Sequence, residues 1–556
     1  MISSFRLKFG RAPGLPATSV NPTAMTVFVG PNNSGKSRVL QEIEQYCRSG
    51  QQNTGMVILD QVSITGLPAA DIPSAIATIT VPPNPGELQQ VGTVILGSRY
   101  GRMAVPVEAL TASLANPSTN LQIVFQWYLN HKTVRLDGPS RISLINSQPA
   151  GDLQATGQST LQVLFRKDTK RLEVRRIIFD AFAEYFVIDP TNLGHLRIRF
   201  STRAPATRSE ERGIDETAVQ FHAKAQPIEN LSDGVKAFTG IVTELIAGDP
   251  QVLLIDEPEA FLHPSLAAKL GKEISKAAVV SDKRVFVSTH SPNFVMGCIQ
   301  SGAQTNIVRL TYRGGVPTAR LLPSSEILEL MRNPLLRSTG VLNGLFYEFV
   351  VVTEADTDRA FYQEINERLL EHKSEWGIPN CLFINAQNKQ TIHSIIRPLR
   401  QLGIPAAGIV DVDIFKEGGT VLSNFLSAAN VPEITRSSLG TSRAAIKNAM
   451  DQSGKKMKQD GGISILTGDS HAAAQDFIAQ LAEYGLFVVA GGELESWLKP
   501  LGATGKGPEW LISMFEKIGE DPTRADYVKP ATGDVWDFIY KIKLWLTKAD
   551  RKGIPA

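Results

Sequence analysis

A glycine-rich segment between a short apolar run and an amphipathic run limits what this chain can fold into. Residues 25–29 are apolar and β-rich and predict a strand, whereas residues 38–43 have the spacing of a helix. In a strand–loop–helix unit of this kind, backbone N–H groups and the helix N-terminus bind phosphate, while a lysine reaches the β/γ-phosphates and a serine holds Mg²⁺. The loop matches GxxxxGK[ST] completely, which predicts an α/β protein that binds ATP through Gly30, Asn32, Asn33, Ser34, Gly35, Lys36 and Ser37.

Two later apolar runs end in residues that suit a nucleotide site. The run 252–255 is followed by Asp256 and Glu257, as expected where one carboxylate holds Mg²⁺ and the next polarises the attacking water. The run 285–288 leads to His290, which is placed either to contact a γ-phosphate or to hydrogen-bond a neighbouring turn. We therefore expect Asp256 and His290 to contact the nucleotide and its metal, and Glu257 to be catalytic.

The polar turn Leu231–Val235 precedes a predicted helix, where Ser232 and Gly234 suit either phosphate binding or simple helix capping. Together with the phosphate loop, the Asp-Glu pair and the histidine, it resembles the Walker A, signature, Walker B and switch-histidine elements of ABC-type ATPases, the group that includes SMC and Rad50-like proteins. Asp233 stands where the LSGGQ signature has glycine. The resemblance implies a head-to-head dimer in which Ser232 contacts the γ-phosphate held by the opposite subunit.

Composition excludes several classes of protein and leaves DNA binding open. The 556 residues include 57 Lys and Arg against 55 Asp and Glu, and the net charge of +2 gives no global bias toward nucleic acid. No stretch approaches the roughly 18 uncharged apolar residues of a membrane span, so we expect no membrane association. The three cysteines are far apart, and no secretory signal begins the chain, which predicts a cytoplasmic protein without a disulfide framework or structural zinc.

Residues 38–229 show no sustained heptad pattern, which predicts a globular insertion in place of the coiled-coil arm of SMC proteins. Within it, residues 166–188 predict one helix with Leu172, Phe179, Phe182 and Phe186 on an apolar face. The same segment carries the densest basic cluster, either a solvated helix face or a DNA contact. Its members are Arg166, Lys167, Lys170, Arg171, Arg175 and Arg176.

The pattern changes after Arg320, where prolines and serines indicate a linker between 325 and 345. We expect an ATPase domain over 1–325 that includes the inserted or dimerisation region 38–229. A linker over 326–344 precedes a second α/β domain over 345–500. Residues 501–556 would form a helical C-terminal extension of that domain.

Carboxylates follow three predicted strands of the second domain, at the strand ends where α/β folds place their sites. A period of two puts Asp411 and Asp413 on the same side of an extended chain. Clustered carboxylates need cations, and oxygen ligands of this kind suit two Mg²⁺ or Mn²⁺ ions that clamp a phosphodiester. The residues are Glu354 and Asp358 after 349–353, Asp411 and Asp413 after 407–410, and Glu493 and Glu495 after 485–490.

Glu354 with Asp358, followed by Asp411-Val412-Asp413, resembles the TOPRIM domain of topoisomerases, DnaG-type primases and certain nucleases, with Ala355 in place of the usual glycine. An ABC-type ATPase followed by a Rossmann-like TOPRIM domain is similar to the OLD (overcoming lysogenization defect) nucleases, including Gabija-type and retron-associated anti-phage effectors. The resemblance implies that Glu354 and Asp358 form a first metal site, with Asp411, Asp413, Glu493 and Glu495 shared between two sites. Asp356 is a lower-ranked ligand. The resemblance also implies a C-terminal lysine that stabilises the transition state, with Lys529 as first candidate and Lys541 as second.

The leading hypothesis is an ATP-regulated, metal-dependent endonuclease of double-stranded DNA in anti-phage defence, with one Mg²⁺ at the ATP and two in the TOPRIM site. It would be a homodimer or higher homo-oligomer, with a companion defence protein as a further partner. The alternative is a nucleotide-sensing scaffold that controls a partner effector or toxin without cutting DNA. An SMC-like repair ATPase is disfavoured by the missing coiled coil, and a topoisomerase by the lack of an identifiable nucleophilic tyrosine.

Overall fold

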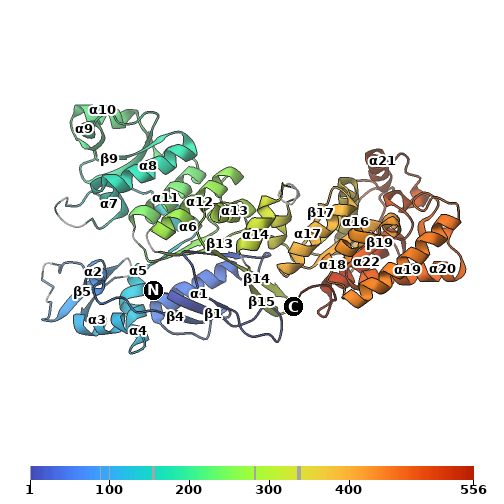
Figure 1. The fold of residues 1–556 in the computed structure, drawn as a ribbon. Helices are drawn as coiled ribbons and strands as arrows, with labels where there is room; N and C mark the ends of the chain where they lie inside the picture. Colours follow the sequence, from blue (N-terminus) through green and yellow to red (C-terminus); the bar gives the residue numbers. More distant parts are fainter. Residues whose placement is uncertain are drawn as a thin grey trace. The chain divides into compact units, whose positions relative to one another are not determined.

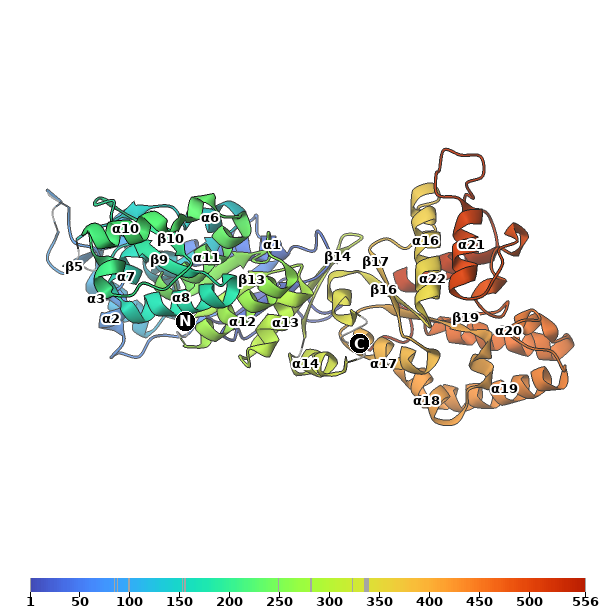
Figure 2. The ribbon, with the colours of Figure 1, turned by 90° about the horizontal axis from the view of Figure 1, so that it is seen from above.

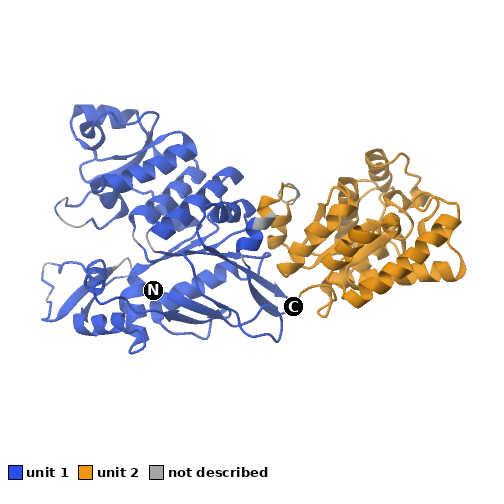
Figure 3. Ribbon diagram, in the orientation of Figure 1, with its two compact units in different colours: residues 1–328 blue, residues 329–556 orange. Residues whose placement is uncertain are grey.

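The computed structural model describes residues 2–84, 86–87, 89–98, 101–152, 154, 157–248, 250–280, 283–322, 324–334 and 340–555. The chain divides into two compact units, Met1–Leu328 and Glu329–Ala556 (Figure 3). Helix α14 (Ser324–Arg332) occupies part of the segment in which we expected a linker. No described helix is long and apolar enough to cross a membrane.

A six-stranded sheet forms the centre of the first unit, in the order β15-β14-β3-β13-β12-β7. The strands β14, β3, β13, β12 and β7 run parallel, and β15 is the antiparallel edge strand. Because parallel strands end at the same edge, the residues that follow β3, β12 and β13 meet there. The bounds are β3 Met25–Val29, β7 Thr133–Leu136, β12 Val252–Asp256, β13 Arg284–Ser288, β14 Thr305–Arg313 and β15 Val316–Leu322.

Helices cover both faces of this sheet (Figures 1 and 2). On one face, α1 (Lys36–Ser49) packs with a second, three-stranded sheet in a shared apolar core that includes Phe5, Phe28 and Phe286. The opposite face carries α11, α12 and α13. The bounds are β1 Ile2–Leu7, β2 Ser19–Val20, β4 Leu59–Ile64, α11 Asp233–Ala247, α12 Pro264–Val280 and α13 Pro292–Gln300.

The rest of the first unit consists of short elements, and no described helix of this unit is longer than the 17 residues of α12. Strand β7 belongs to the central sheet, so region 38–229 is interrupted by a core strand. These elements are α2 Ile72–Ala77, β5 Thr93–Ser98, β6 Gly101–Pro106, α3 Val107–Ala115, α4 Leu121–Ile123, a π-helix Val124–Leu129, α5 Asn130–Lys132, α6 Gly138–Ser143, β8 Gln148–Pro149, α7 Thr160–Arg166, α8 Asp168–Phe182, β9 Tyr185–Asp189, β10 His195–Ser201, α9 Arg208–Arg212, α10 Glu216–Lys224, β11 Gln226–Pro227 and a 3-10 helix Ile228–Asn230.

The single helix that we predicted over 166–188 is wrong in its extent. Helix α8 ends at Phe182 because Ala183 adopts a left-handed backbone with φ 57° and caps it, and the chain then continues as β9. Leu172 and Phe179 are exposed, so the apolar face that we expected is not fully buried. The apolar spacing continued from α8 into β9 without a glycine or proline, which left no stop signal in the sequence.

The second unit contains a four-stranded parallel sheet in the order β17-β16-β18-β19. One face packs against α16, α21 and α22, whose core includes Phe361, Trp510 and Trp536. The helices α21 and α22 lie within 501–556. The bounds are a 3-10 helix Val341–Phe346, β16 Phe349–Thr353, α16 Asp356–His372, β17 Cys381–Asn385, α17 Lys389–Gln401, β18 Ala406–Asp411, a 3-10 helix Val412–Lys416, α18 Gly419–Ala428, α19 Glu433–Gln452, a 3-10 helix Gly462–Ile465, α20 Gly468–Glu483, β19 Leu486–Val489, 3-10 helices Leu494–Ser496 and Lys499–Leu501, α21 Pro508–Ile518 and α22 Asp534–Thr547.

Candidate functional sites: a nucleotide loop and a carboxylate cluster

The loop between β3 and α1 needs glycine at two positions. Gly30 has φ 143°, and a Cβ there would lie 2.0 Å from the carbonyl oxygen of Leu310. Gly35 has φ 93° at the N-cap of α1, a backbone conformation that other residues adopt only with strain. The chain therefore turns sharply enough to direct the N-terminus of α1 toward a ligand at the sheet edge.

Lys36 folds back over this loop. Its ammonium donates to the carbonyl oxygens of Gly30 at 2.9 Å and Pro31 at 2.7 Å. Burial lowers the pKa of Lys36 to about 8, although Glu257 and Asp256 oppose this effect. A phosphate beside the loop would raise the pKa of Lys36 again, because an opposite charge favours the protonated amine.

Ser37 and Asp256 come together at the carboxyl edge of the sheet. The Ser37 hydroxyl donates to Asp256 Oδ1 at 2.8 Å, and the Ser288 hydroxyl donates to the same oxygen. The parallel pairing of β12 with β13, and of β13 with β3, brings these strand ends together. A hydroxyl beside a carboxylate offers the hard oxygen ligands that Mg²⁺ prefers.

Glu257 and His290 face each other at this edge. His290 Nε2 lies 3.3 Å from Glu257 Oε1, and both side chains are partly exposed. Burial, followed by the nearby Lys36, lowers the pKa of His290, which favours its neutral form. Glu257 therefore lies beside an imidazole whose neutral form is favoured, and its role on water remains a prediction.

Glu259 is a residue of this site that sequence reasoning missed. Its Oε1 accepts a hydrogen bond from the backbone N–H of His290 at 2.7 Å, and burial raises the pKa of its carboxyl. Glu259 thus fixes the turn that carries His290. The signal in the sequence that could have identified Glu259 was its position two residues beyond Glu257.

The signature segment begins α11. Ser232 is exposed and makes no side-chain capping hydrogen bond within the described residues. Gly234 is buried, and a Cβ there would lie 2.6 Å from the carbonyl oxygen of Phe261. Phe261 itself is 64% exposed and has a left-handed backbone with φ 69°. The segment is therefore held against a neighbouring loop, with its serine directed to solvent.

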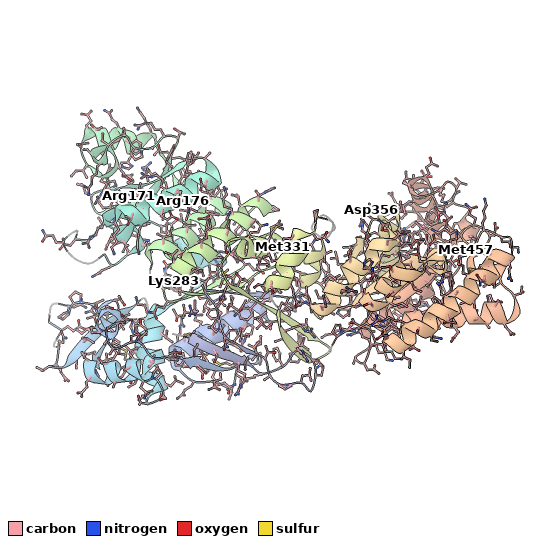
Figure 4. All side chains as sticks on the ribbon, viewed as in Figure 1. Arg171, Arg176, Lys283, Met331, Asp356 and Met457 are labelled. Carbon is pink, nitrogen blue, oxygen red and sulfur yellow. The ribbon has the colours of Figure 1, made fainter. Side chains whose placement is uncertain are left out.

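The three arginines of α8 form internal ion pairs. Arg171 and Arg175 are buried, and both donate to Glu211, Arg171 at 2.8 Å. Arg176, labelled with Arg171 in Figure 4, pairs with Glu273 at 2.7 Å as well as with carboxylates of its own helix. These three arginines therefore do not contribute unpaired charge to a DNA-binding face.

In the second unit, three carboxylates meet at the carboxyl edge of the sheet. Glu354 follows β16 and accepts a hydrogen bond from the backbone N–H of Asp411 at 2.9 Å. One oxygen each of Glu354, Asp411 and Asp413 lies within 4.8 Å of the others. Asp413 sits in a 3-10 helix and not in the extended chain that we expected, so the tight turn after β18 brings it beside Asp411.

Two carboxyl groups of this cluster, and that of Asp358 beside it, have raised pKa values. Burial, and then repulsion from Asp411, raise the pKa of Glu354 to about 8 and that of Asp358 to about 7. Burial also raises the pKa of Asp411. Asp413 Oδ1 is buried without a hydrogen-bond partner within the described residues. An orphaned oxygen among carboxylates that resist ionisation fits a divalent cation, which would supply both the missing partner and the opposing charge.

The remaining predicted ligands border this cluster. Asp358 accepts from the backbone N–H of Ala355 at 2.8 Å, and Glu495 accepts from that of Gly507 at 2.8 Å. Glu493 lies 3.3 Å from Lys506. These three carboxylates are outside the 4.8 Å group of the described residues. Their place as ligands remains a prediction.

Asp356 is directed to other partners. Its Oδ1 accepts from Arg359 at 2.6 Å and from Asn385 at 3.0 Å, and 69% of its side chain is exposed. Figure 4 labels it on the second unit. Among the described residues, Asp356 lies outside the group formed by Glu354, Asp411 and Asp413.

Lys458 is a residue of the cluster that sequence reasoning missed. Its Nζ lies 2.5 Å from Asp411, 3.4 Å from Asp413 and 4.0 Å from Glu493. The loop that carries Lys458 packs closely against Gly492, because a Cβ on Gly492 would lie 2.2 Å from the carbonyl oxygen of Lys458. Burial works against the charge of Lys458, but Asp411 outweighs it, and the pKa of Lys458 is raised.

Neither lysine that we predicted contacts these carboxylates within the described residues. Lys529 and Lys541 are both exposed, and Lys541 lies on α22. The backbone before Lys529 is held by Arg368, which donates to the carbonyl oxygen of Val528 at 3.1 Å and stacks over Tyr527. The fold instead brings Lys458 to Asp411 and Asp413, and Lys389 to Asp413 at 2.7 Å.

We expect that Lys458→Met binds Mn²⁺ about tenfold more tightly than the wild type, because the ammonium competes with a metal for Asp411 and Asp413. The same change should lower the thermal stability of the metal-free protein. Electron paramagnetic resonance of Mn²⁺, without nucleotide, measures the affinity. Lys506→Met is the matched control, since its side chain is 66% exposed and, among the described residues, it pairs only with Glu493. Weaker Mn²⁺ binding by Lys458→Met would contradict the competition.

Two family models match the chain in the order that the sites suggest. Residues 156–296 match the AAA domain model AAA_21, whose description also names the AbiEii toxin and a Type IV TA system. Residues 345–413 match the TOPRIM domain of overcoming lysogenization defect protein-like proteins. The chain thus joins an ATPase domain to an OLD-like TOPRIM domain, which is the arrangement of an OLD-type ATPase–TOPRIM fusion. The domain-level resemblance predicted from the motifs is confirmed.

Among solved structures, part of this chain is similar to SMC head domains. An SmcHead bound to the C-winged helix domain of ScpA is 13% identical with a TM-score of 0.32, over 59% of this chain and 99% of that one. The SMC head domain from Thermotoga maritima is 14% identical with a TM-score of 0.30, over 58% and 98%. No curated protein matches the sequence.

Proposed function

We propose that this protein is an ATP-regulated, divalent-metal-dependent endonuclease of double-stranded DNA that acts in cytoplasmic anti-phage defence. The observation that carries the proposal is the convergence of Glu354, Asp411 and Asp413 within 4.8 Å at the edge of an OLD-like TOPRIM sheet. The OLD-type domain arrangement supports the role in defence, in which a companion protein is a further proposed partner.

The proposed chemistry is phosphodiester hydrolysis. Mg²⁺ or Mn²⁺, when bound, would activate water and neutralise the charge that develops on the phosphate. Glu354, Asp411 and Asp413 would hold one ion, and Asp358, Glu493 and Glu495 would complete a second site. The donor set supports this assignment, because it is all carboxylate oxygen. A bound cation would also attract the scissile phosphate.

The test is conversion of a supercoiled plasmid to linear DNA by the purified protein with Mg²⁺ or Mn²⁺, with and without ATP. Cleavage that requires a divalent ion and responds to ATP is the expected result. Intact plasmid under every condition, with ATP still hydrolysed, would favour the nucleotide-sensing scaffold. The ion pairs of Lys458 and Lys389 with Asp413, at 3.4 and 2.7 Å, are the observation that favours that second candidate, because they neutralise the cluster without a metal.

We further propose that two ATPase units form a dimer around nucleotide, with Ser232 of one protomer on the phosphate held by Lys36 of the other. The exposure of Ser232 supports this arrangement, because its hydroxyl makes no capping hydrogen bond among the described residues and is open to a second protomer. The same face would be incomplete as a catalytic site in a single protomer.

Ser232→Arg is expected to lower the ATPase rate about 50-fold or more without weakening nucleotide binding, because only the contact across the dimer is lost. Steady-state ATPase assays and binding of a fluorescent ATP analogue measure the two effects. An equimolar mixture of Ser232→Arg with Lys36→Ala should recover activity, since the mixed dimer has one intact composite site. A mixture as inactive as its components would contradict the dimer.

A further inference from the structure

Arg141 is a buried guanidinium beneath the carboxylates of the nucleotide site. It lies on α6, directly after the edge strand β7, and its side chain is 2% exposed. Its Nη1 donates to the backbone carbonyl oxygen of Asp256 at 3.1 Å and to that of Glu257. Arg141 therefore holds the backbone at the end of β12. The two residues that it holds are Asp256, which we expect to bind metal, and Glu257, which we expect to activate water.

The backbone that Arg141 holds is strained. Glu257 has φ 50°, a left-handed conformation that is unfavourable for a residue with a Cβ. Its N–H donates to the carbonyl oxygen of Ser288 at 2.9 Å, and its own carbonyl accepts from Arg141. The two contacts fix the peptide on both sides of Glu257, and this conformation directs the side chain toward His290.

The guanidinium of Arg141 is buried close to three carboxylates. Its Nε is buried without a partner among the described residues. Burial lowers the pKa of Arg141, and the nearby carboxylates of Glu259, Asp256 and Glu257 oppose this effect. A guanidinium bonded to backbone carbonyls rather than to these carboxylates leaves their oxygens available for metal and water. A salt bridge in the same place would occupy them.

Helix α6 is itself held in place. Asp137 caps it by accepting from the Ser140 backbone N–H at 3.0 Å. On the other side, Gly240 of α11 approaches so closely that a Cβ there would lie 2.2 Å from the carbonyl oxygen of Arg141. Any side chain at position 240 would therefore displace α6, and Arg141 with it.

We propose that Arg141 is a positioning residue for ATP hydrolysis, which holds Glu257 in its left-handed conformation so that the carboxylate meets the attacking water. The inference rests on the proposed ATPase function and adds a residue that acts through Glu257 without touching the nucleotide. A residue with this role affects the chemical step and leaves the binding of ATP unchanged.

The test compares Arg141→Met and Arg141→Lys with wild type in ATPase kinetics, binding of a fluorescent ATP analogue and thermal unfolding. We expect kcat of Arg141→Met to fall about 100-fold while KM and the affinity change less than about threefold. Arg141→Lys keeps one donor and should recover about tenfold of that loss. Arg176→Met, which removes a guanidinium from α8, is the matched control and should keep kcat within about twofold.

Gly240→Ala provides a second route to the same displacement without changing Arg141. It should lower kcat with KM retained, and the double variant with Arg141→Met should lose no more than Arg141→Met alone. An unchanged kcat in Arg141→Met, or a rise in KM that accounts for the whole effect, would overturn the inference. If Arg141→Met does not fold, an unchanged kcat in both Arg141→Lys and Gly240→Ala would also overturn the inference. A wild type without ATPase activity would instead refute the proposed function itself.

Discussion

Glu354→Gln is expected to reduce plasmid cleavage by at least about 10³-fold while the ATPase rate stays within about twofold. Glutamine keeps the shape of the side chain, and its amide oxygen can still accept from the backbone N–H of Asp411, the bond that measures 2.9 Å in the wild type. What is lost is the negative charge in the group formed with Asp411 and Asp413. Loss of cleavage without loss of folding would thus identify Glu354 as a metal ligand.

Stability provides an independent readout of the same variant. The pKa of Glu354 is raised to about 8 in the folded chain, against about 4.5 for an unhindered carboxyl, so the folded state binds this proton more tightly than the unfolded state does. The free energy of unfolding contributed by this group therefore falls as the pH rises from about 4.5 to about 8. Glu354→Gln should raise the melting temperature of the metal-free protein at pH 8 and remove the stabilisation that Mn²⁺ gives to wild type.

Asp356→Asn is the matched control, because Asp356 lies two residues away but bonds to Arg359 and Asn385. It should cut plasmid within about twofold of the wild-type rate. If Asp356→Asn abolished cleavage while Glu354→Gln did not, the assignment of ligands would be wrong.

The parts of these sites that the sequence predicted are those that follow from local rules. Glycines of a phosphate loop, apolar strands and carboxylates at strand ends are all properties of short segments. Parallel pairing then brings the strand ends together, as the contact of Ser37 with Asp256 shows. Asp413 was predicted beside Asp411 for the wrong reason, because a 3-10 turn follows β18 directly.

The parts that were missed depend on tertiary packing. Lys458 lies in a polar loop with other lysines, and only the close approach of that loop to Gly492 brings it to the carboxylates. The arginines of α8 looked like a basic face because Glu211 and Glu273, their partners, are far away in sequence. Arg141 likewise finds its acceptors 115 and 116 residues later in the chain.

Glu257→Gln is expected to lower the ATPase kcat by about 10²–10³-fold while ATP still binds, because the variant keeps the phosphate loop and loses only the carboxylate that acts on water. Glu259→Gln is the matched control. Its carboxyl is buried, its pKa is raised, and its contact is a hydrogen bond from the His290 backbone that glutamine can still accept. Glu259→Gln should therefore retain at least about a tenth of the wild-type rate. An equal loss of kcat in the two variants would contradict the role of Glu257 as the carboxylate that acts on water.

The same variant reveals how nucleotide and cleavage are linked. Glu257→Gln should hold ATP and accumulate as a dimer, measured by light scattering, whereas Lys36→Ala should lose the nucleotide because the ammonium over the phosphate loop is gone. The two variants represent opposite nucleotide states of one protein, with the carboxylate cluster of the second unit unchanged. A difference between their plasmid cleavage rates in the presence of ATP is the expected signature of regulation, and its direction tells whether ATP activates or inhibits. Identical rates would mean that the ATPase does not control the nuclease.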